Sequence, residues 1–469
     1  MVDSDISELI TRKKKTIEDN VMIKHLKMTN VGPAPKMELE FGKRLNVITG
    51  DNGLGKSFLL DIAWWAMTRK WPAELNSRLT SGKVALPTDK KQEAEIDFSF
   101  SAVSTTKDYT SKFEPRGQNW KVQQGRPANP GLVFYAMADG SFAVWDPARN
   151  YWKSKTSDES KERSAAYVFS PKDVWDGLQS HDGTWLCNGL IRDWAGWQKE
   201  KGRAFESLIS VLDGLSPSST EKIVPGSLTR ISLDDVRDMP TLKMLYGQEV
   251  AVVHASAGMR RIITLAYFLV WCWEEHLKAK ELLGEEPVTN TVFLIDEVES
   301  HLHPKWQRVV IPALMNVMKQ LTNSKGILLI DDIEDCAHPI ETLLPADVQL
   351  IAVTHSPLVM ASVEAWFDRA QDAWFDLDLL VNNVELTQRE FVRQGDVRSW
   401  LTSEAFDLKS GYSIEAETAL EEAALALSNE RFSKDNALSL EQRLRTVLSD
   451  IDPFWMRWRF VAEKRGWTL

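Results

Sequence analysis

A glycine-rich segment between an apolar run and a helix-forming run places the strongest constraint on what this chain can fold into. The segment reads GDNGLGKS at 50–57 and follows the apolar run Leu45–Thr49. In this context the pattern is typical of a loop that binds the phosphates of a nucleotide. Its glycines let backbone N–H groups converge on the phosphates, and the helix that follows adds the positive end of its dipole. The chain is therefore predicted to fold around a nucleotide site.

The loop assigns a role to two of its side chains. Lys56 is expected to reach the β- and γ-phosphates, and Ser57 is expected to ligate Mg²⁺. ATP and Mg²⁺ are therefore the predicted cofactors. The residues predicted to contact the nucleotide in this segment are Gly50, Asp51, Asn52, Gly53, Leu54, Gly55, Lys56, Ser57 and Phe58.

Two carboxylates end a second apolar run, Thr291–Ile295. Asp296 is predicted to hold Mg²⁺, directly or through water, and Glu297 to orient and polarise the attacking water. A strand can also end in two acids without any catalytic role. Because these acids accompany a phosphate loop, the catalytic interpretation is favoured, and ATP hydrolysis is predicted.

A histidine follows a third apolar run, LIAVT at 350–354. His355 in Thr354-His355-Ser356-Pro357 could hydrogen-bond the γ-phosphate or hold the water and Glu297 in place. A lone histidine is more often structural. At a strand end in this order of motifs, a catalytic sensor is the favoured interpretation.

The segment ASAGMR at 255–260 stands directly before a long predicted helix, 259–277. Alone, it would indicate only a helix cap. With it, the order of motifs resembles the ABC ATPase superfamily: phosphate loop, signature, carboxylate strand, D-loop and switch histidine. Ser256 and Gly258 resemble the serine and central glycine of the signature, whereas Ala257 departs from the common form. The resemblance implies that the signature caps the γ-phosphate held by the opposite subunit, so that two copies complete the site head to tail.

Two further superfamily motifs are placed by the same resemblance. ESHLHP at 299–304 stands where the D-loop runs between subunits. Its two histidines beside an acid could also form a metal site, but the D-loop explains their position and is favoured. A Q-loop glutamine is expected between Lys56 and Ser256. Gln179 and Gln198 are both candidates, and the choice between them stays open.

The predicted fold class is α/β, an ABC-type P-loop ATPase with a mixed β-sheet, a helical lid insertion and a helical C-terminal region. Helical spacing is expected through 172–215, and one helix is expected from Lys305 to Leu321. The predicted divisions are an N-terminal extension at 1–20, an ATPase lobe with the phosphate loop at 21–165, the lid at 166–250, a second ATPase lobe with signature, carboxylate strand, D-loop and switch histidine at 251–400, and helices at 401–469.

The forms DEVESHLHP and THSPLV resemble the RecF/OLD-like group of ATPases, over about residues 20–362. Roughly 200 residues without sustained heptads separate the phosphate loop from the signature, unlike the coiled-coil branches of the superfamily. Within the group the chain looks most like the ATPase subunit of Septu, an anti-phage system, with the ATPase of PARIS as a close rival. This resemblance implies an ATP-driven sensor and scaffold that gates a separate nuclease, with an HNH type favoured and a Toprim type as the alternative.

Two other functions are weighed against this one. A RecF-like DNA-repair ATPase would clamp DNA, and a basic groove across the dimer would favour it. An OLD-type enzyme would cut nucleic acid itself and needs an Asp-x-Asp pair in a Toprim domain. Asp376 and Asp378 match that pair, but 375–391 alternates like a hairpin that closes the ATPase sheet, and too little chain follows for a Toprim fold.

Composition bounds the partners and the compartment. A net charge of −11 argues against a broadly positive surface that would bind DNA. Nucleic acid stays a candidate partner if the chain has a local basic groove. The apolar run Ile262–Cys272 is too short to span a bilayer, so no membrane is expected. The cysteines Cys187, Cys272 and Cys336 lack metal-ligand spacing, and the N-terminus has no apolar signal core. A reducing cytoplasm is expected.

Tryptophan is abundant, with 19 residues that cluster in pairs such as Trp64 with Trp65 and Trp194 with Trp197. Packing in cores and interfaces is the favoured interpretation, and stacking on nucleic-acid bases is the alternative. The C-terminal aromatic residues could dock the nuclease partner or pack within the chain. They are Phe454, Trp455, Trp458, Phe460 and Trp467.

Overall fold

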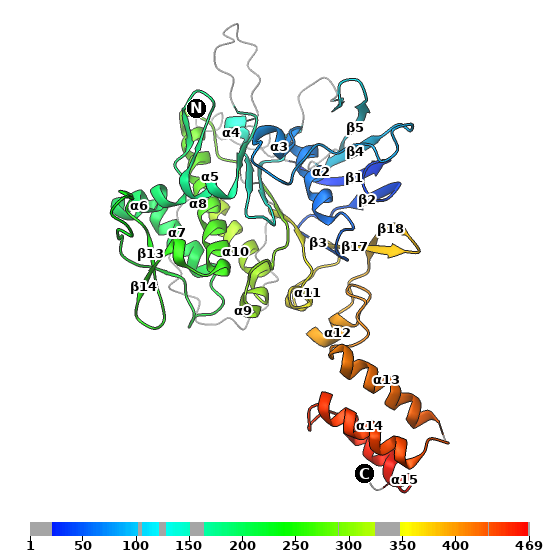
Figure 1. Ribbon diagram of the computed structural model, residues 1–469. Coiled ribbons are helices and arrows are strands. Elements are labelled where there is room, and N and C mark those ends of the chain that lie inside the picture. The colour runs from blue at the N-terminus through cyan, green and yellow to red at the C-terminus, as the bar shows by residue number, and fades with distance from the viewer. Residues whose placement is uncertain are drawn as a thin grey trace, which may run out of the picture. The chain divides into compact units, whose positions relative to one another are not determined.

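A computed structural model places the glycine-rich loop at the edge of a large mixed sheet (Figure 1). The structure describes residues 21–101, 106–121, 128–150, 164–288, 290–323, 348–429 and 431–467. The predicted N-terminal extension and Cys336 lie outside these residues. The chain divides into two compact units, Met1–Gly395 and Asp396–Leu469, each with its own hydrophobic core. The finer divisions expected from the sequence stay predictions.

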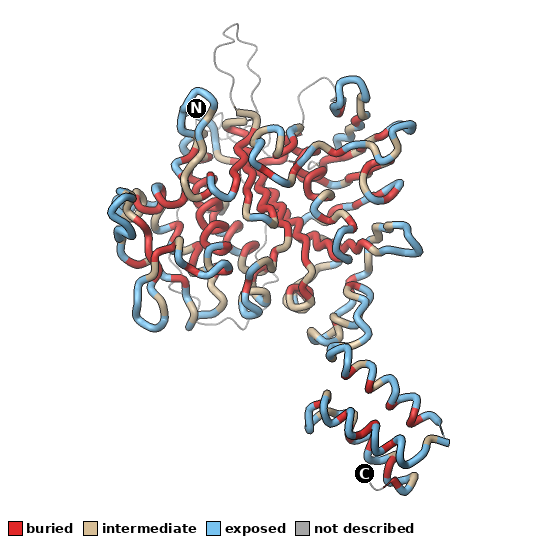
Figure 2. Tube along the Cα trace, in the orientation of Figure 1, coloured by how far each residue is buried: buried red, intermediate tan, exposed pale blue. Residues whose placement is uncertain are grey.

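The large sheet has eight strands in the order β18-β17-β3-β16-β15-β7-β8-β9. Its five inner strands, β17 to β7, run parallel to one another, whereas β18, β8 and β9 each pair antiparallel with the neighbouring strand. The central strands are almost wholly apolar and buried, as expected for a parallel sheet covered on both faces (Figure 2). The strands are β3 (Leu45–Gly50), β7 (Leu132–Ala136), β8 (Phe142–Trp145), β9 (Tyr167–Phe169), β15 (Thr291–Ile295), β16 (Val348–Val353), β17 (Ala373–Leu380) and β18 (Asn383–Arg389).

A second, antiparallel sheet has the order β2-β1-β4-β5-β6. Buried and exposed residues alternate along β2, which is the pattern of a sheet with one face in the core and one in solvent. Helix α2 (Lys56–Thr68) contacts both sheets, and its residues are almost all buried. One core cluster therefore joins Leu26 of the second sheet, Trp64 of α2 and Ile351 of the large sheet. The strands are β1 (Met22–Thr29), β2 (Lys36–Glu40), β4 (Glu95–Ser101), β5 (Thr106–Glu114) and β6 (Asn119–Trp120). The short helix α3 (Pro72–Leu75) contacts β9 of the large sheet, and α4 (Pro147–Asn150) follows β8.

The predicted lid contains helices and also small sheets. The helices are α5 (Pro171–Asp176), α6 (Leu190–Glu200) and α7 (Arg203–Gly214). Two sheets were not predicted, one of β10 (Leu178–Gln179) with β11 (Trp185–Cys187), and one of β12 (Val224–Pro225), β13 (Thr241–Lys243) and β14 (Glu249–Ala251). Strands of two or three residues are too short for an alternating pattern to be recognised in the sequence.

The signature segment starts the long helix α8 (Ala257–Leu283), after a 3₁₀ turn at Val252–His254. The helix ends at Gly284, which has φ 64 and forms a left-handed cap. The single helix expected over 305–321 is wrong, because α9 (Pro304–Gln307) and α10 (Val310–Asn323) are separate. Val309 N–H donates to the carbonyl of Trp306, an i to i−3 bond that interrupts the α-helical ladder. The next helix, α11 (Pro357–Val363), follows β16.

The C-terminal unit is helical, as predicted, with α12 (Val397–Leu401), α13 (Ile414–Ser428), α14 (Lys434–Val447) and α15 (Phe454–Lys464). Alanines at 416, 419, 423 and 426 form a stripe of small side chains on α13 that belongs to the same buried cluster as large indole rings. Trp455, Trp458 and Trp467 are in that core, whereas Phe460 is 64% exposed. A docking surface built from all five C-terminal aromatic residues is therefore wrong, because most of them stabilise the bundle.

Packing also accounts for tryptophans elsewhere. Trp64, Trp65, Trp194 and Trp271 are buried, which confirms the packing interpretation for these residues. In the part of the chain that the structure describes, no helix combines the length and apolar character needed to cross a bilayer.

Candidate nucleotide-binding site

Three sequence motifs meet at one edge of the large sheet. Strand β16 pairs in parallel with β3 on one side and with β15 on the other. Carboxyl ends of parallel strands lie at the same edge, so the segments that follow them become neighbours. The glycine-rich loop, the two acids and the switch histidine follow β3, β15 and β16 respectively. The sheet thus gathers residues that are far apart in the sequence.

The loop conformation depends on glycine. Gly50, Gly53 and Gly55 have φ of 127, 81 and 97, values that other residues rarely adopt. A Cβ atom on Gly50 would also lie 2.3 Å from the carbonyl oxygen of Leu377 on the neighbouring strand β17. The first glycine of the motif is therefore required by close backbone packing as well as by the turn.

Lys56 lies inside the loop. Its Nζ donates hydrogen bonds to the carbonyls of Gly50 (2.8 Å) and Asp51 (2.6 Å). Burial lowers the pKa of Lys56, and the charge of Asp296 is the largest of the effects that oppose this shift. The ammonium group is thus desolvated and surrounded by acceptors, which suits a cation that binds phosphate.

Ser57 and Asp296 form the candidate metal site. Burial raises the pKa of Asp296, and a hydrogen bond with the Ser57 side chain opposes that rise. Among the described residues, Asp296 Oδ1 is buried without a hydrogen-bond partner. A buried carboxylate oxygen of this kind calls for a ligand, and hydroxyl and carboxylate oxygens are ligands that Mg²⁺ prefers. The residues present therefore fit the predicted ion.

Glu297 occupies an unusual backbone conformation. Its φ is 46, in the left-handed region. The N–H of the preceding residue, Asp296, still donates to the carbonyl of Ala136 on β7. A non-glycine residue in this region is strained, and such strain is common at functional sites. The carboxylate acts electrostatically on both Lys56 and His355. Its place is consistent with a base near the Lys56 ammonium group that is predicted to bind phosphate.

His355 is half-buried at the end of β16. Burial lowers the pKa of the imidazole, and the positive charge of Lys56 lowers it further, while Glu297 opposes the shift. At neutral pH the ring is therefore expected to be neutral, with one donor and one acceptor nitrogen. That state suits a ring that hydrogen-bonds a phosphate or a water molecule.

A buried acid near this edge was missed from the sequence. Asp61 follows Ser57 by one turn on the same face of α2, and it accepts a 2.9 Å hydrogen bond from the hydroxyl of Tyr135 on β7. Burial raises the pKa of Asp61 to about 7, with a contribution from the charge of Asp296. The four-residue spacing from Ser57 was visible in the sequence, but the tyrosine partner depends on the strand order.

Asp61 should make the nucleotide-free protein less stable as the pH rises. Its folded pKa of about 7 lies above the ordinary value of 3.8, so between these values the native state holds a proton that the unfolded state has lost. The free energy of unfolding should fall by at most about 4 kcal/mol over this window. Asp61→Asn should remove that part of the pH dependence in denaturant melts at pH 4 to 8. The exposed Asp234→Asn is the control, and identical pH profiles for wild type and Asp61→Asn would contradict the expectation.

The signature residues have roles within their own chain. Ser256 is the exposed N-cap of α8, where its side chain accepts a 3.3 Å hydrogen bond from the N–H of Met259. Gly258 is buried, and a Cβ there would lie 2.6 Å from the carbonyl oxygen of His301. Arg261 donates to the carbonyls of Met137 (2.8 Å) and Asp296 (3.2 Å). The start of α8 is thus tied to the D-loop segment and to the end of the carboxylate strand.

The two Q-loop candidates differ in their surroundings. The amide of Gln198 accepts from Trp194 Nε1 (3.2 Å) and donates to the carbonyl of Gly226 (2.7 Å). Gln179 is exposed on β10. These surroundings do not assign the Q-loop role to either residue, and the choice between them stays open.

Asp376 and Asp378 belong to the ATPase sheet. They lie on β17, which pairs with β18 as an antiparallel hairpin and with β3 in parallel, as the alternating pattern predicted. The hydroxyl of Thr49 donates to Asp376 at 2.6 Å, and Arg389 forms ion pairs with both acids. Burial raises the pKa of Asp376 to about 6. These contacts account for the pair without a nuclease site.

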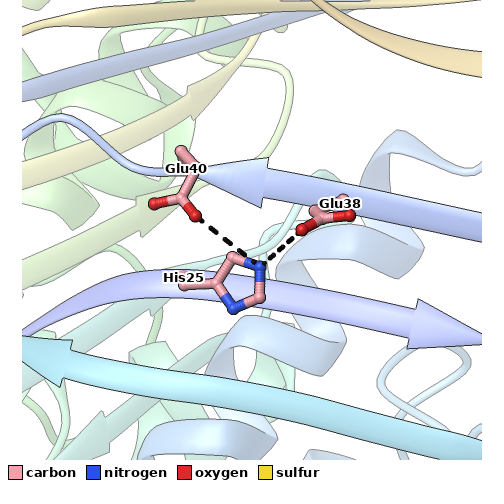
Figure 3. A group of neighbouring side chains, drawn as sticks. All are labelled: His25, Glu38 and Glu40. Atoms are coloured by element: carbon pink, nitrogen blue, oxygen red, sulfur yellow. Dashed lines mark hydrogen bonds and ion pairs between the residues drawn. The ribbon is translucent and has the colours of Figure 1, made fainter. Parts of the chain in front are cut away.

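A group of possible metal ligands lies on the second sheet (Figure 3). His25 Nε2 is 3.0 Å from Glu38 Oε1 and 3.7 Å from Glu40 Oε1. Lys36 Nζ is 2.6 Å from the other oxygen of Glu38, and this hydrogen bond, followed by that of His25, lowers the pKa of Glu38. The group is explained as a surface ion-pair cluster. The D-loop histidines, His301 and His303, belong to no three-ligand group among the described residues.

A family model described as "AAA domain, putative AbiEii toxin, Type IV TA system" matches residues 45–361. This span begins at β3 and includes the phosphate loop, the signature, the carboxylate strand and the switch histidine.

Three known proteins resemble the chain. The "Retron Ec83 probable ATPase" of Escherichia coli is 25% identical over 275 residues, which cover 57% of this chain and 42% of that protein. The "Retron Vc95 probable ATPase" of Vibrio cholerae serotype O1 biovar El Tor is 21% identical over 430 residues, which cover 77% of this chain and 76% of that protein. The "Septu protein PtuA" of Bacillus thuringiensis is 21% identical, with 72% of each chain covered. The chain thus matches less than half the length of the first relative. Among solved structures, the SMC head domain from Thermotoga maritima matches with a TM-score of 0.36 and 13% identity, covering 79% of this chain and 100% of that chain.

Proposed function

The chain belongs to the family of AAA domains described as "putative AbiEii toxin, Type IV TA system", and on that premise we propose that it binds and hydrolyses ATP as a subunit of a bacterial anti-phage defence complex. The observation that carries the ATPase proposal is the meeting of Lys56, Asp296 and His355 at one edge of a parallel sheet. The relatives named for retrons and for Septu support the defence role and confirm the predicted resemblance to the ATPases of such systems.

In this proposal Lys56 holds the β- and γ-phosphates through its ammonium group. Ser57 and Asp296 would hold Mg²⁺, which when bound neutralises charge on the phosphate oxygens. Glu297 orients a water molecule and accepts its proton, and the neutral ring of His355 hydrogen-bonds the γ-phosphate or the water. The buried ammonium group of Lys56 and, among the described residues, the unpartnered Oδ1 of Asp296 support the first two roles.

Phosphate release by the purified full chain tests the ATPase proposal. ATP should be converted to ADP and phosphate in the presence of Mg²⁺, and EDTA should stop the reaction. A well-folded chain that shows no ATP binding in calorimetry would overturn the proposal.

We further propose that the site is completed by a second copy, as a homodimer or a higher homo-oligomer. Ser256 is exposed in its own chain, so it is free to meet a nucleotide held by another copy. Ser256→Arg should inactivate, and so should Lys56→Ala. Mixed dimers would contain one site with intact Lys56 and intact Ser256, so an equal mixture should recover about a quarter of wild-type turnover.

A matched control for the helix-capping role of Ser256 is available. Ser433 is an exposed N-cap of α14, and its side chain also accepts a 3.3 Å backbone hydrogen bond. Ser433→Arg should leave turnover unchanged. If both inactive variants fold and associate but show no recovery on mixing, the shared site is wrong.

The proposed effector is a separate nuclease, with an HNH type favoured over a Toprim type. The lone chain should cut neither DNA nor RNA, because Asp376 and Asp378 are accounted for by Thr49 and Arg389. Co-expression with the neighbouring gene product should yield a complex that cuts in an ATP-dependent manner, since ATP would bias a two-state switch. Metal-dependent cutting by the lone chain that is lost in Asp378→Ala would instead favour the OLD-type nuclease.

A further inference from the structure

Glu299 directs its carboxylate at the switch histidine. Its Oε2 accepts a 2.7 Å hydrogen bond from the Thr354 hydroxyl, and its Oε1 accepts a 2.5 Å hydrogen bond from the backbone N–H of His355. Burial raises the pKa of Glu299, and these two hydrogen bonds oppose the rise. A partly buried carboxylate that accepts hydrogen bonds from two adjacent residues, one on each oxygen, restricts this segment to one geometry.

The N–H of His355 needs such a partner because the strand ladder ends just before it. The N–H of Thr354 still donates to the carbonyl of Ile48 on β3, at 3.1 Å. Beyond this point β16 leaves the sheet, and a desolvated backbone donor without an acceptor would be costly. The Glu299 carboxylate therefore takes the place of a strand carbonyl as the acceptor for the N–H of His355.

A second side chain from the same segment holds the next residue. The Ser356 hydroxyl donates to Gln307 Oε1 at 2.7 Å, and Gln307 Nε2 donates to the carbonyl of Leu302 at 2.9 Å. Residues 299–307 thus hold Thr354, His355 and Ser356 in succession. The same segment also packs against the signature helix, where His301 leaves no room for a Cβ on Gly258.

We propose that Glu299 is a positioning residue for His355, and this proposal rests on the ATPase function proposed above. The imidazole must meet a phosphate or water oxygen within a few tenths of an ångström, and such precision comes from the groups that hold its backbone. We assign its effect to the hydrolysis step, because among the described residues its side chain hydrogen-bonds Thr354 and His355 and no residue of the phosphate loop. ATP affinity should therefore be separable from turnover.

Glu299→Gln removes the charge and one acceptor while it keeps the size of the side chain. We expect its ATP affinity to stay within about 2-fold of wild type and its kcat to fall about 10- to 100-fold, the usual effect of losing a group that orients a reactive one. Glu299→Asp keeps the charge with less reach and should be intermediate. Glu249 is the matched control, because it also accepts from one backbone N–H, that of Ser227 (2.9 Å), and from one threonine hydroxyl, that of Thr241 (3.2 Å). Glu249→Gln should keep wild-type turnover.

A double-mutant cycle with His355→Ala decides whether the effect passes through the histidine. If Glu299 acts through His355, the double variant should turn over at the rate of His355→Ala alone. Three results would each overturn the proposal. The turnover losses of the two single variants could multiply in the double variant, Glu299→Gln could keep wild-type turnover, or its ATP affinity could fall as much as its kcat. Wild-type protein that does not hydrolyse ATP would instead overturn the proposed function, so the two failures are distinguishable.

Discussion

Glu297→Gln is expected to bind ATP with near wild-type affinity and to lose about 10²- to 10⁴-fold in turnover. Glutamine keeps the size and the hydrogen-bonding reach of the side chain but lacks the negative charge that polarises water. The backbone at this position is already in the left-handed region, with φ 46, and the substitution does not add a branched side chain that would worsen the strain. Steady-state phosphate release and ATP binding should be measured on the same preparation.

The variant should also accumulate the ATP-bound dimer, because ATP that is not hydrolysed keeps the two copies associated. Light scattering after size-exclusion chromatography with ATP would detect this species. Glu286→Gln, an exposed acid before β15, is the control and should turn over normally. Near-normal turnover of Glu297→Gln would assign the base to another residue.

Lys56→Ala is expected to weaken ATP binding by about 10²-fold or more, since truncating a buried, hydrogen-bonded charge costs several kcal/mol. The Lys56 side chain is buried among the loop carbonyls, and its charge has no substitute inside the loop. Binding should be measured by calorimetry, with circular dichroism as the check on folding.

Lys56→Met separates charge from packing, because it retains an apolar stem without the ammonium group. Both variants should show the same loss of ATP affinity, whereas Lys70→Ala, at an exposed position just after α2, should bind like wild type. Wild-type affinity in the Met variant would show that the glycine-rich loop is not the phosphate site.

Local sequence patterns predicted much of the fold. The apolar run expected at Thr291–Ile295 coincides with β15, and the run at Leu45–Thr49 lies within β3. These strands are bounded by turn residues and are apolar or alternating, so their signal lies within a few residues. The helical C-terminal region and the β17–β18 hairpin were predicted for the same reason.

Predictions failed where the outcome depended on contacts between distant segments. The helix expected over 305–321 is interrupted between Gln307 and Val310. Just before the break, the indole N–H of Trp306 donates to the carbonyl of Leu215, the residue that follows α7. The C-terminal aromatic residues look alike in the sequence, yet Trp458 is fully buried and Phe460 is exposed. Helical periodicity shows which residues share a face, but it does not show which face meets the alanines of α13.

The sequence by itself determined the residue types of the candidate site. Spacing within a few residues places Lys56 and Ser57 after the glycines, and Asp296 and Glu297 after an apolar strand. Only the tertiary structure decided that Glu299 holds His355 and that Asp61 meets Tyr135. These partners are 56 and 74 positions apart, and they meet because strand order and register bring the elements together. A hydrogen bond depends on distance in space, and sequence spacing reports that distance only within a single helix, strand or turn.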